Sequence, residues 1–178
     1  KTFQESKDLY SVTIPNSIVY IGENAFSGCD NLDEVHISDL SAWCNIDFTG
    51  VSNPLYAPGR PFLVLNGEKV FDLVIPDDVK EIKKLAFHGC SSLQTLSISN
   101  SVTTIGKEAF QSCSSLTSIT IPKTVTKIEE AAFALCDLQS IVVESGNPKY
   151  DSRDNCKAII ETSSNKLIVG SRQSIIPN

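Results

Sequence analysis

The sequence predicts an α/β-type solenoid, in which copies of one short structural unit stack along an axis. Three observations lead to this fold class. A 23-residue repeat runs through most of the chain, and the spacing of apolar residues changes character inside each copy. In addition, one copy is too small to bury its own apolar residues, so neighbouring copies must cover one another.

The repeat is clearest in residues 93–115 and 116–137, whose apolar positions agree one for one. Other copies follow the same template, although the second and the sixth are longer and contain insertions. We expect a single repeat domain over residues 1–178. Its repeats lie near residues 9–31, 32–69, 70–92, 93–115, 116–137 and 138–170.

Each copy begins with Leu-x-x-Ile-x-Ile, as at Leu116, Ile119 and Ile121. This period of two is typical of a strand with one buried face, and β-branched residues favour that state. A polar turn and a Val-x-x-Ile segment follow. The copy ends with Ala-Phe-x-x-Cys, as at residues 132–136, whose spacing predicts a short helical turn. Stacked copies therefore predict one parallel β-sheet with strands about 4.8 Å apart.

The two insertions are predicted to project from one side of the stack. In the first, a short helix is expected at residues 40–44, with Asp39 as its cap. Residues 62–71 follow as a predicted β-hairpin around the tight turn Asn66-Gly67. A second β-hairpin is predicted at residues 157–169. Insertions break the uniformity of a repeat surface, so they are natural places for specificity.

Composition and charge exclude two classes of function. Of the 178 residues, 41% are hydrophobic and 20% are charged, and no stretch approaches the roughly eighteen consecutive apolar residues of a membrane span. The chain has 15 Lys and Arg against 21 Asp and Glu, a net charge of −6. With no positive excess and no basic cluster, nucleic acid is not an expected partner.

Both ends of the chain fall inside repeats. The chain contains no methionine, and residues 2–9 are in register with residues 109–116, the last third of a copy. Residues 175–178 match residues 13–16, in the first third of a copy. We therefore expect the sequence to be an excerpt from a longer array.

The cysteines follow the repeat rather than a disulfide framework. Four cysteines occupy the same position in four copies, each close to a phenylalanine that recurs in every one of these copies. They are Cys29, Cys90, Cys113 and Cys136. Stacking makes their side chains point the same way, which disfavours a bridge, so we expect small, buried, reduced thiols. Cys44 and Cys156 lie in separate insertions, and nothing in the sequence pairs them.

No catalytic or metal site is predicted, and no cofactor is expected. The two histidines are His36 and His88, there is no Cys-x-x-Cys, and His88 and Cys90 would diverge around a turn. The acidic loop at residues 151–155 lacks the Gly and Glu placement of a calcium loop. An enzyme would require a deep cleft lined by acidic residues of the insertions, namely Asp47, Asp151 or Asp154.

The surface of the predicted sheet is the main functional candidate. Its residues are short and mostly hydroxylated, which is consistent either with ordinary solvent-facing strands or with a flat docking surface. Trp43 and Tyr56 of the first insertion are further candidates because aromatic residues favour interface centres, although the spacing of Trp43 to Leu40 and Cys44 indicates packing onto the stack. The candidate sheet residues are Ser11, Thr13, Glu34, His36, Asp72, Thr95, Ser97, Ser118, Thr120 and Ser140.

The repeat unit at residues 116–136 resembles the BspA-like leucine-rich repeat family, as do the inserted phrases at residues 36–48 and 144–156. The resemblance covers nearly the whole chain. It implies a right-handed leucine-rich repeat stack and a bacterial surface or secreted protein of host-associated anaerobes. For some members it also implies adhesion to host extracellular proteins. Because the family motif is structural, no binding residues carry over.

The favoured function is a non-enzymatic, monomeric protein-binding or adhesive module. Its expected partner is a protein or glycan, with host extracellular matrix among the candidates. The alternative is a structural spacer that has no ligand of its own and holds another domain away from the cell envelope. An enzyme is the third and least favoured hypothesis.

Overall fold

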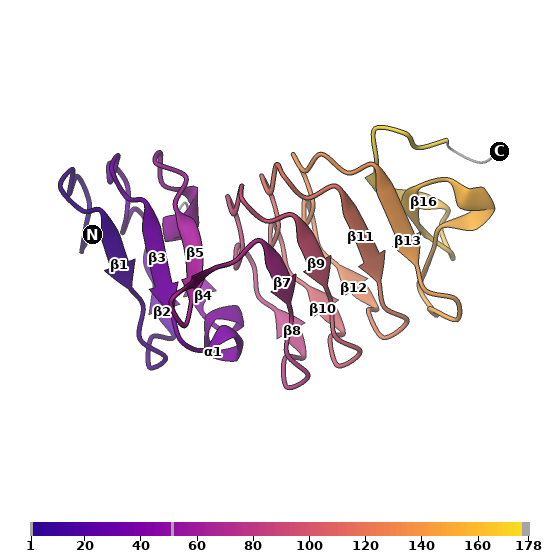
Figure 1. Cartoon of the computed structure of the whole chain (residues 1–178). Helices are drawn as coiled ribbons and strands as arrows, with labels where there is room; N and C mark the ends of the chain where they lie inside the picture. The colour runs from indigo at the N-terminus through magenta and orange to yellow at the C-terminus, as the bar shows by residue number, and fades with distance from the viewer. Residues whose placement is uncertain (1, 51, 176–178) are drawn as a thin grey trace.

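Short parallel strands form the front of an elongated stack, and the stack axis runs from the N-terminal to the C-terminal end (Figure 1). The computed structural model describes residues 2–50 and 52–175. Each coil contributes one strand to the front of the stack, except the second (residues 32–69), which contributes two. These front strands are β1 (Ser11–Thr13), β3 (Glu34–Ile37), β5 (Phe62–Leu65), β7 (Asp72–Val74), β9 (Thr95–Ser97), β11 (Ser118–Ile121) and β13 (Ser140–Val143).

A second series of two-residue strands lies behind the front strands (Figure 1). They arise from the Val-x-x-Ile segments, so the predicted extended segment is confirmed. Parallel pairs join β8 to β10 and β10 to β12, and β2 to β4. These back strands are β2 (Tyr20–Ile21), β4 (Asp47–Phe48), β8 (Glu81–Ile82), β10 (Thr104–Ile105) and β12 (Lys127–Ile128).

The predicted alternation of buried and exposed residues is confirmed along the front strands. In β9, Leu96 is buried between exposed Thr95 and Ser97. The strands pair in parallel with the repeat register, so that Asp72 lies opposite Thr95 and Leu73 opposite Leu96. Each buried position therefore stacks on its counterpart in the next coil and forms one core along the axis.

The front strands do not form the single continuous sheet that the sequence predicts. Strands β1, β3 and β5 pair in one sheet, whereas β7 pairs with β9 and β11 with β13. Strands β9 and β11 remain in contact, but β5 and β7 do not pair. The sheet is broken there because β5 turns back through Asn66 and Gly67 into β6 (Glu68–Lys69), which occupies its free edge.

The first insertion also departs from the predicted layout. Glu34 of β3 pairs with Phe62 of β5, 28 positions further on, so the second coil is simply wider than the others. Strand β5 is therefore part of the front sheet rather than a projection from its side. Its antiparallel pairing with β6 forms a short hairpin that leads the chain into β7.

In place of the predicted helical turns, each coil has a run of tight turns. In the fourth coil Gln111 N donates to Glu108 O (3.2 Å), whereas the alternate donor Phe110 N reaches Ala132 O of the next coil (2.8 Å). Glu108 and Ser112 have φ of 57° and 64°. In a helix these backbone N–H groups would all donate within one coil. In the turns every second N–H donates to the next coil, so the hydrogen bonds satisfy the backbone of two coils.

A phenylalanine ladder fills the core behind these turns. The Phe87 and Phe110 rings are stacked with centroids 5.2 Å apart, and Phe110 stacks on Phe133 at 5.3 Å. Phe3 and Phe26 form a similar pair in the first coils, at 5.3 Å. Stacked rings at this spacing contribute packing beyond the area they bury.

The wide second coil contains α1 (Leu40–Cys44) and a 3₁₀ turn, η1 (Pro54–Tyr56). Asp39 caps α1 as predicted, since its carboxylate accepts a hydrogen bond from Ala42 N (3.0 Å). Leu55 of η1 is fully buried in the core.

An antiparallel sheet lies at the C-terminal end of the stack (Figure 1). In it β15 pairs with both β14 and β16, and β13 contacts β14 and β15. The sheet covers the last coil with buried residues such as Ile159. Its elements are β14 (Tyr150–Asp151), a 3₁₀ turn η2 (Arg153–Asn155), β15 (Ala158–Glu161) and β16 (Lys166–Gly170).

Candidate functional site

The candidate sheet residues lie on the solvent side of the front strands, which we call the front face. Pairing brings several of them together, with Ser11 opposite Glu34 and Ser118 opposite Ser140. The break between β5 and β7 divides the set into two groups. Those before it are Ser11, Thr13, Glu34 and His36, and those after it are Asp72, Thr95, Ser97, Ser118, Thr120 and Ser140.

Charged residues gather where the front face is broken. Lys69 of β6 lies 3.3 Å from the Glu34 carboxylate and 3.9 Å from the centroid of the Phe62 ring. The other Glu34 oxygen lies 3.0 Å from His36 Nε2. Hydrogen bonding by Lys69, assisted by His36, lowers the pKa of Glu34 below its ordinary value.

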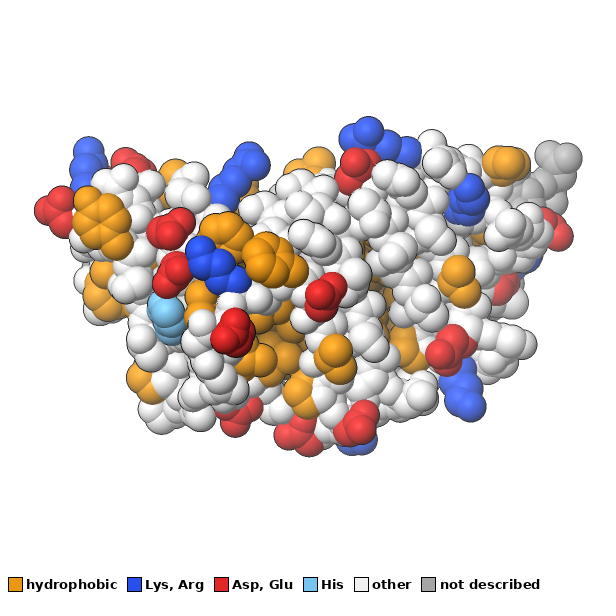
Figure 2. All heavy atoms as spheres, in the orientation of Figure 1, with side chains coloured by type: hydrophobic (Ala, Val, Ile, Leu, Met, Phe, Trp, Pro, Cys, Tyr) orange, Lys and Arg blue, Asp and Glu red, His pale blue; other side chains and the backbone are white. Residues whose placement is uncertain are grey.

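Aromatic residues that were not among the predicted site residues flank this charged cluster. Phe62 and Phe71 meet edge to face across the break, with ring centroids 6.0 Å apart. Phe71 is 39% exposed, and Tyr10, at the equivalent position before β1, is also exposed. Figure 2 shows hydrophobic side chains gathered near the centre of this face, with a largely uncharged surface over β9 and β11. The signal in the sequence was an aromatic residue at the position before a front strand.

Trp43 does not belong to the candidate surface. Its side chain is only 1% exposed, and its indole Nε1 donates to Ala86 O at 2.8 Å. Its ring also packs edge to face against Phe48. Trp43 therefore fixes the wide coil to the next one, as its spacing indicated, and cannot contact a partner while the protein is folded.

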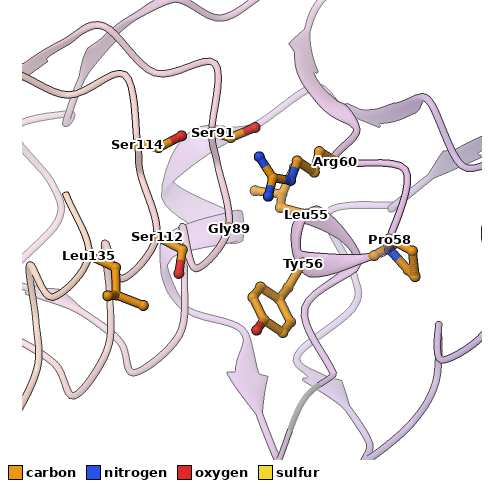
Figure 3. Close-up of a pocket in the computed structure, with 10 residues that line it drawn as sticks. Leu55, Tyr56, Pro58, Arg60, Gly89, Ser91, Ser112, Ser114 and Leu135 are labelled. Atoms are coloured by element: carbon orange, nitrogen blue, oxygen red, sulfur yellow. The ribbon is translucent and has the colours of Figure 1, made fainter. Parts of the chain in front are cut away.

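Tyr56 lies in a groove between the first insertion and the turns of the following coils (Figure 3). The groove has a volume of about 550 Å³, within the range of about 300–1,000 Å³ that is usual for ligand pockets. The Tyr56 side chain is 46% exposed and its ring lies over His88, with centroids 4.2 Å apart. Burial lowers the pKa of His88 below its ordinary value.

The two walls of the groove have different origins. Tyr56, Pro58 and Arg60 come from the insertion, and the opposite wall comes from the turn runs of three coils (Figure 3). On that wall Gly89, Ser112 and Leu135 occupy equivalent positions, all with positive φ. Glycine is needed at the first because a Cβ there would lie 2.8 Å from Leu55 O. Ser91 and Ser114 form a second equivalent pair.

A smaller hollow lies on the other side of the insertion. It has a volume of about 190 Å³ and is lined by the first coil at residues 24–28 and by Asn53, Tyr56 and Pro58. The insertion is therefore a ridge between two hollows, and Tyr56 borders both.

One four-residue sequence, Asn-Pro-x-Tyr, occurs in both insertions, at residues 53–56 and 147–150. In the first, Asn53 Nδ2 donates to Leu85 O and Ala86 O at 2.7 and 2.8 Å. In the second, Asn147 Nδ2 donates to Pro122 O and Val125 O, both at 2.9 Å. Each asparagine also accepts from a backbone N–H two residues later. The recurrence of this sequence marks the two junctions, the places where each insertion meets a neighbouring coil.

The acidic residues of the insertions do not line the groove. Asp47 pairs with Lys83 (2.9 Å), and Asp151 pairs with Arg153 (2.6 Å), whose hydrogen bond lowers the Asp151 pKa. Asp154 lies in η2, in the other insertion from Asp47. Within residues 2–50 and 52–175, no group of three or more His, Cys, Asp or Glu could hold a metal ion. In the same residues no helix has the length and hydrophobicity needed to cross a membrane.

The six cysteines are free thiols. The thiols of Cys29, Cys113 and Cys136 point back along the axis, and Cys113 Sγ donates to Phe87 O of the preceding coil (3.3 Å). Burial raises the pKa of Cys90 to about 12 and also raises that of Cys113. Cys136 differs from the prediction because it is only partly buried. Cys44 and Cys156 are both buried and lie in separate insertions.

Comparison with solved structures finds similar folds in bacterial leucine-rich repeat proteins. A leucine-rich cell surface protein from Faecalibacterium prausnitzii A2-165 is 28% identical, with a TM-score of 0.54 over 90% of this chain and 45% of that one. A leucine-rich repeat protein from Eubacterium ventriosum is 20% identical, with a TM-score of 0.55 over 98% and 44%. The pneumococcal vaccine antigen PcpA is 24% identical, with a TM-score of 0.54 over 92% and 37%.

This chain thus spans less than half the length of each of these three structures. No curated protein sequence matches it. The model of the BspA type leucine-rich repeat region matches six copies, over residues 1–49 and 66–158. The unmatched residues 50–65 include the ridge beside the groove. With most of its length matched, the chain belongs to the BspA-type leucine-rich repeat family.

Proposed function

We propose that the chain is a non-enzymatic protein-binding module and that its front face docks a partner protein. The observation that carries this proposal is the edge-to-face pair of exposed Phe71 and half-buried Phe62 near the centre of the front face. Aromatic side chains next to a charged rim are typical of the energetic centre of an interface. The Lys69 and Glu34 pair supplies such a rim.

The rest of the front face favours docking at low cost. Thr95, Ser97, Ser118 and Thr120 are short and exposed, so little side-chain entropy is lost when a partner covers them. Backbone pairing holds the strands in place, and a solenoid presents such a face over several coils. The structure therefore offers a preformed surface rather than one that must be ordered on binding.

We also propose that the parent protein acts at the bacterial cell surface or after secretion. Family membership supports this location, as does the likeness to the Faecalibacterium cell surface protein. A host extracellular matrix protein is the proposed partner, and residues 1–178 act as one monomeric, right-handed repeat domain.

The test uses the intact chain and a panel of immobilised host matrix proteins, namely collagen, laminin, fibronectin and fibrinogen. Saturable binding to a panel member supports the proposal. Phe71→Ser should weaken that binding about thirtyfold if Phe71 is an interface centre. Val19→Ser is the matched control, because Val19 is an exposed apolar residue that precedes a back strand. Absence of saturable binding to the whole panel would overturn the adhesive proposal.

The alternative, a structural spacer, predicts a different pattern on cells. Replacing Glu34, His36, Thr95 and Ser97 together with alanine would leave adhesion of the parent protein unchanged. Deleting whole repeats would reduce adhesion by shortening the reach. A loss of adhesion from the four substitutions alone would contradict the spacer.

A further inference from the structure

We propose that the groove beside Tyr56 binds an oligosaccharide that bears a carboxylate. This site is separate from the front face, and the proposal does not rest on the proposed function. It starts from a groove of about 550 Å³ that has an exposed aromatic ring, an arginine and several serine hydroxyls on its walls.

The Tyr56 ring packs on His88, but its hydroxyl has no role in the fold of the described residues. The comparison is with Tyr150, which ends the same Asn-Pro-x-Tyr sequence. Tyr150 is 4% exposed, and its hydroxyl accepts a hydrogen bond from Ile128 N at 3.0 Å. The Tyr56 hydroxyl has no hydrogen-bond partner among the described residues, and its ring borders the groove. Tyr56 is therefore free to contact a ligand.

Arg60 provides a positive charge without a carboxylate neighbour. No described Asp or Glu lies within ion-pair distance of its guanidinium, although the chain carries a net charge of −6. Its backbone is fixed, since Arg60 N donates to Ala57 O (2.8 Å) and a Cβ at Gly59 would lie 2.3 Å from Leu32 O. A guanidinium pairs with a carboxylate through two parallel hydrogen bonds.

The opposite wall supplies hydroxyl groups at a regular spacing. Ser91 and Ser114 occupy equivalent positions in successive coils, which lie about 4.8 Å apart. Ser112 adds a third hydroxyl to the same wall (Figure 3). None of the three has a side-chain hydrogen bond to another described residue. Each can both donate to and accept from a ligand hydroxyl.

An oligosaccharide fits these groups better than a peptide does. A peptide would gain most by adding a strand, but the backbone of this wall is occupied, since Gly89 N donates to Gln111 O and Ser112 N to Ala134 O. The groove therefore offers side chains to its ligand. The apolar face of a sugar ring can pack on Tyr56, its hydroxyls can pair with the serines, and a uronic acid carboxylate can pair with Arg60.

The test measures binding by isothermal titration calorimetry with two matched probes. One is a hyaluronan hexasaccharide, and the other is the same hexasaccharide with its carboxylates reduced to alcohols. We expect saturable binding of the acidic probe and at least tenfold weaker binding of the reduced one. Arg60→Gln should weaken binding of the acidic probe by roughly tenfold or more and leave binding of the reduced probe unchanged.

Two control variants separate the site from general effects. Lys123→Gln removes one positive charge from an exposed turn at the other end of a coil, and it should leave binding unchanged. Replacing Glu34, His36, Thr95 and Ser97 with alanine should also leave it unchanged, so failure of the front-face proposal and failure of this one are distinguishable. Tyr56→Ala should abolish binding while its circular dichroism spectrum stays that of the folded parent chain.

Three results would overturn the proposal. The first is the absence of saturable binding of the acidic hexasaccharide. The second is binding that does not depend on the carboxylate, seen either as equal binding of the reduced probe or as an Arg60→Gln variant that binds the acidic probe as well as the parent chain does. The third is binding of an acidic peptide, such as hexaglutamate, that depends on Arg60 while the hexasaccharide does not bind.

Discussion

The two Asn-Pro-x-Tyr turns share a sequence and differ in what surrounds them. Asn53 and Asn147 make equivalent hydrogen bonds, since each side-chain amide donates to two carbonyls of a neighbouring coil. The tyrosines do not, because Tyr150 is buried under β12 whereas Tyr56 is half exposed beside the groove. The asparagine is thus the structural residue of the turn, and the tyrosine takes the role its surroundings allow.

The difference follows from what each junction lacks. At the second junction no back strand follows β12 within the described residues, and the Tyr150 hydroxyl accepts the hydrogen bond of Ile128 N. At the first junction no described backbone N–H donates to Ala86 O, which accepts hydrogen bonds from the side chains of Trp43 and Asn53 instead. Two side chains already complete that junction, so Tyr56 remains available.

The largest expected effect comes from Trp43→Ala. It removes a buried ring and a hydrogen bond to Ala86 O, and it should lower the free energy of unfolding by about 3–5 kcal/mol. Urea denaturation measures this loss. Leu135→Ala is the control, because Leu135 is 73% exposed and its truncation should cost less than about 0.5 kcal/mol. Similar losses for both variants would contradict this account of the first junction.

Asn53→Ala should cost more than Asn147→Ala. Asn53 is buried, so its loss removes a cap from Leu55 N and leaves the Leu85 carbonyl without its side-chain donor; we expect about 2–4 kcal/mol. Asn147 is only partly buried, and water can replace its amide, so about 1–2 kcal/mol is expected. Equal midpoint shifts in urea would show that the two asparagines are equally accessible to water.

Removing the tyrosine hydroxyl should lower stability at the second turn and leave it unchanged at the first. Tyr150→Phe leaves Ile128 N without its acceptor and should cost about 1 kcal/mol. Tyr56→Phe removes a hydroxyl that the fold does not use, so the change should lie within about 0.5 kcal/mol of zero. Thermal unfolding followed by circular dichroism measures both. A destabilised Tyr56→Phe would give Tyr56 a structural role and weaken the case for a binding role.

The smallest effect is a pH dependence that belongs to the first turn. Burial lowers the pKa of His88, under Tyr56, below the ordinary value of 6.5. Above pH 6.5 the folded and unfolded states both hold a neutral ring. As the pH falls below 6.5 the unfolded state takes up the proton first, so stability is lost. Between about pH 7.5 and pH 5.5, the parent chain should lose more stability than His88→Gln. Parallel losses in urea would refute this.

The regular part of the fold could be predicted because each coil repeats the same physical problem. Leu116, Ile119 and Ile121 alternate with polar residues, and a unit of this size can bury them only by stacking. The spacing of Ala132, Phe133 and Cys136 was misleading, because it suits both a helix and a run of turns. The turns form because their backbone N–H groups also donate hydrogen bonds to the next coil, and these bonds exist only when the coils are stacked.

The candidate site was only partly predictable for a similar reason. Exposure of Ser97 or Thr120 follows from the strand period alone, and both lie on the front face. The meeting of Phe62 and Phe71 depends on β5 entering the sheet, and the groove depends on residues 53–60 lying against turns about 30 to 80 positions later. Such long-range contacts leave no periodic signal, although the recurrence of Asn-Pro-x-Tyr marked the two junctions.

At Ala86 O, side-chain hydrogen bonds replace the backbone hydrogen bond found between regular coils, and this has a consequence for the evolution of the array. Between regular coils, cohesion comes from main-chain groups that every residue possesses, so replacing one side chain leaves those bonds in place. Between the second and third coils two main-chain bonds are described, Lys83 N to Cys44 O and Val70 N to Leu63 O. The side chains of Trp43 and Asn53 supplement them. Here, as at the second insertion, where Asn147 and Tyr150 bond to the preceding coil, a point mutation can weaken or strengthen the attachment of one coil to the next.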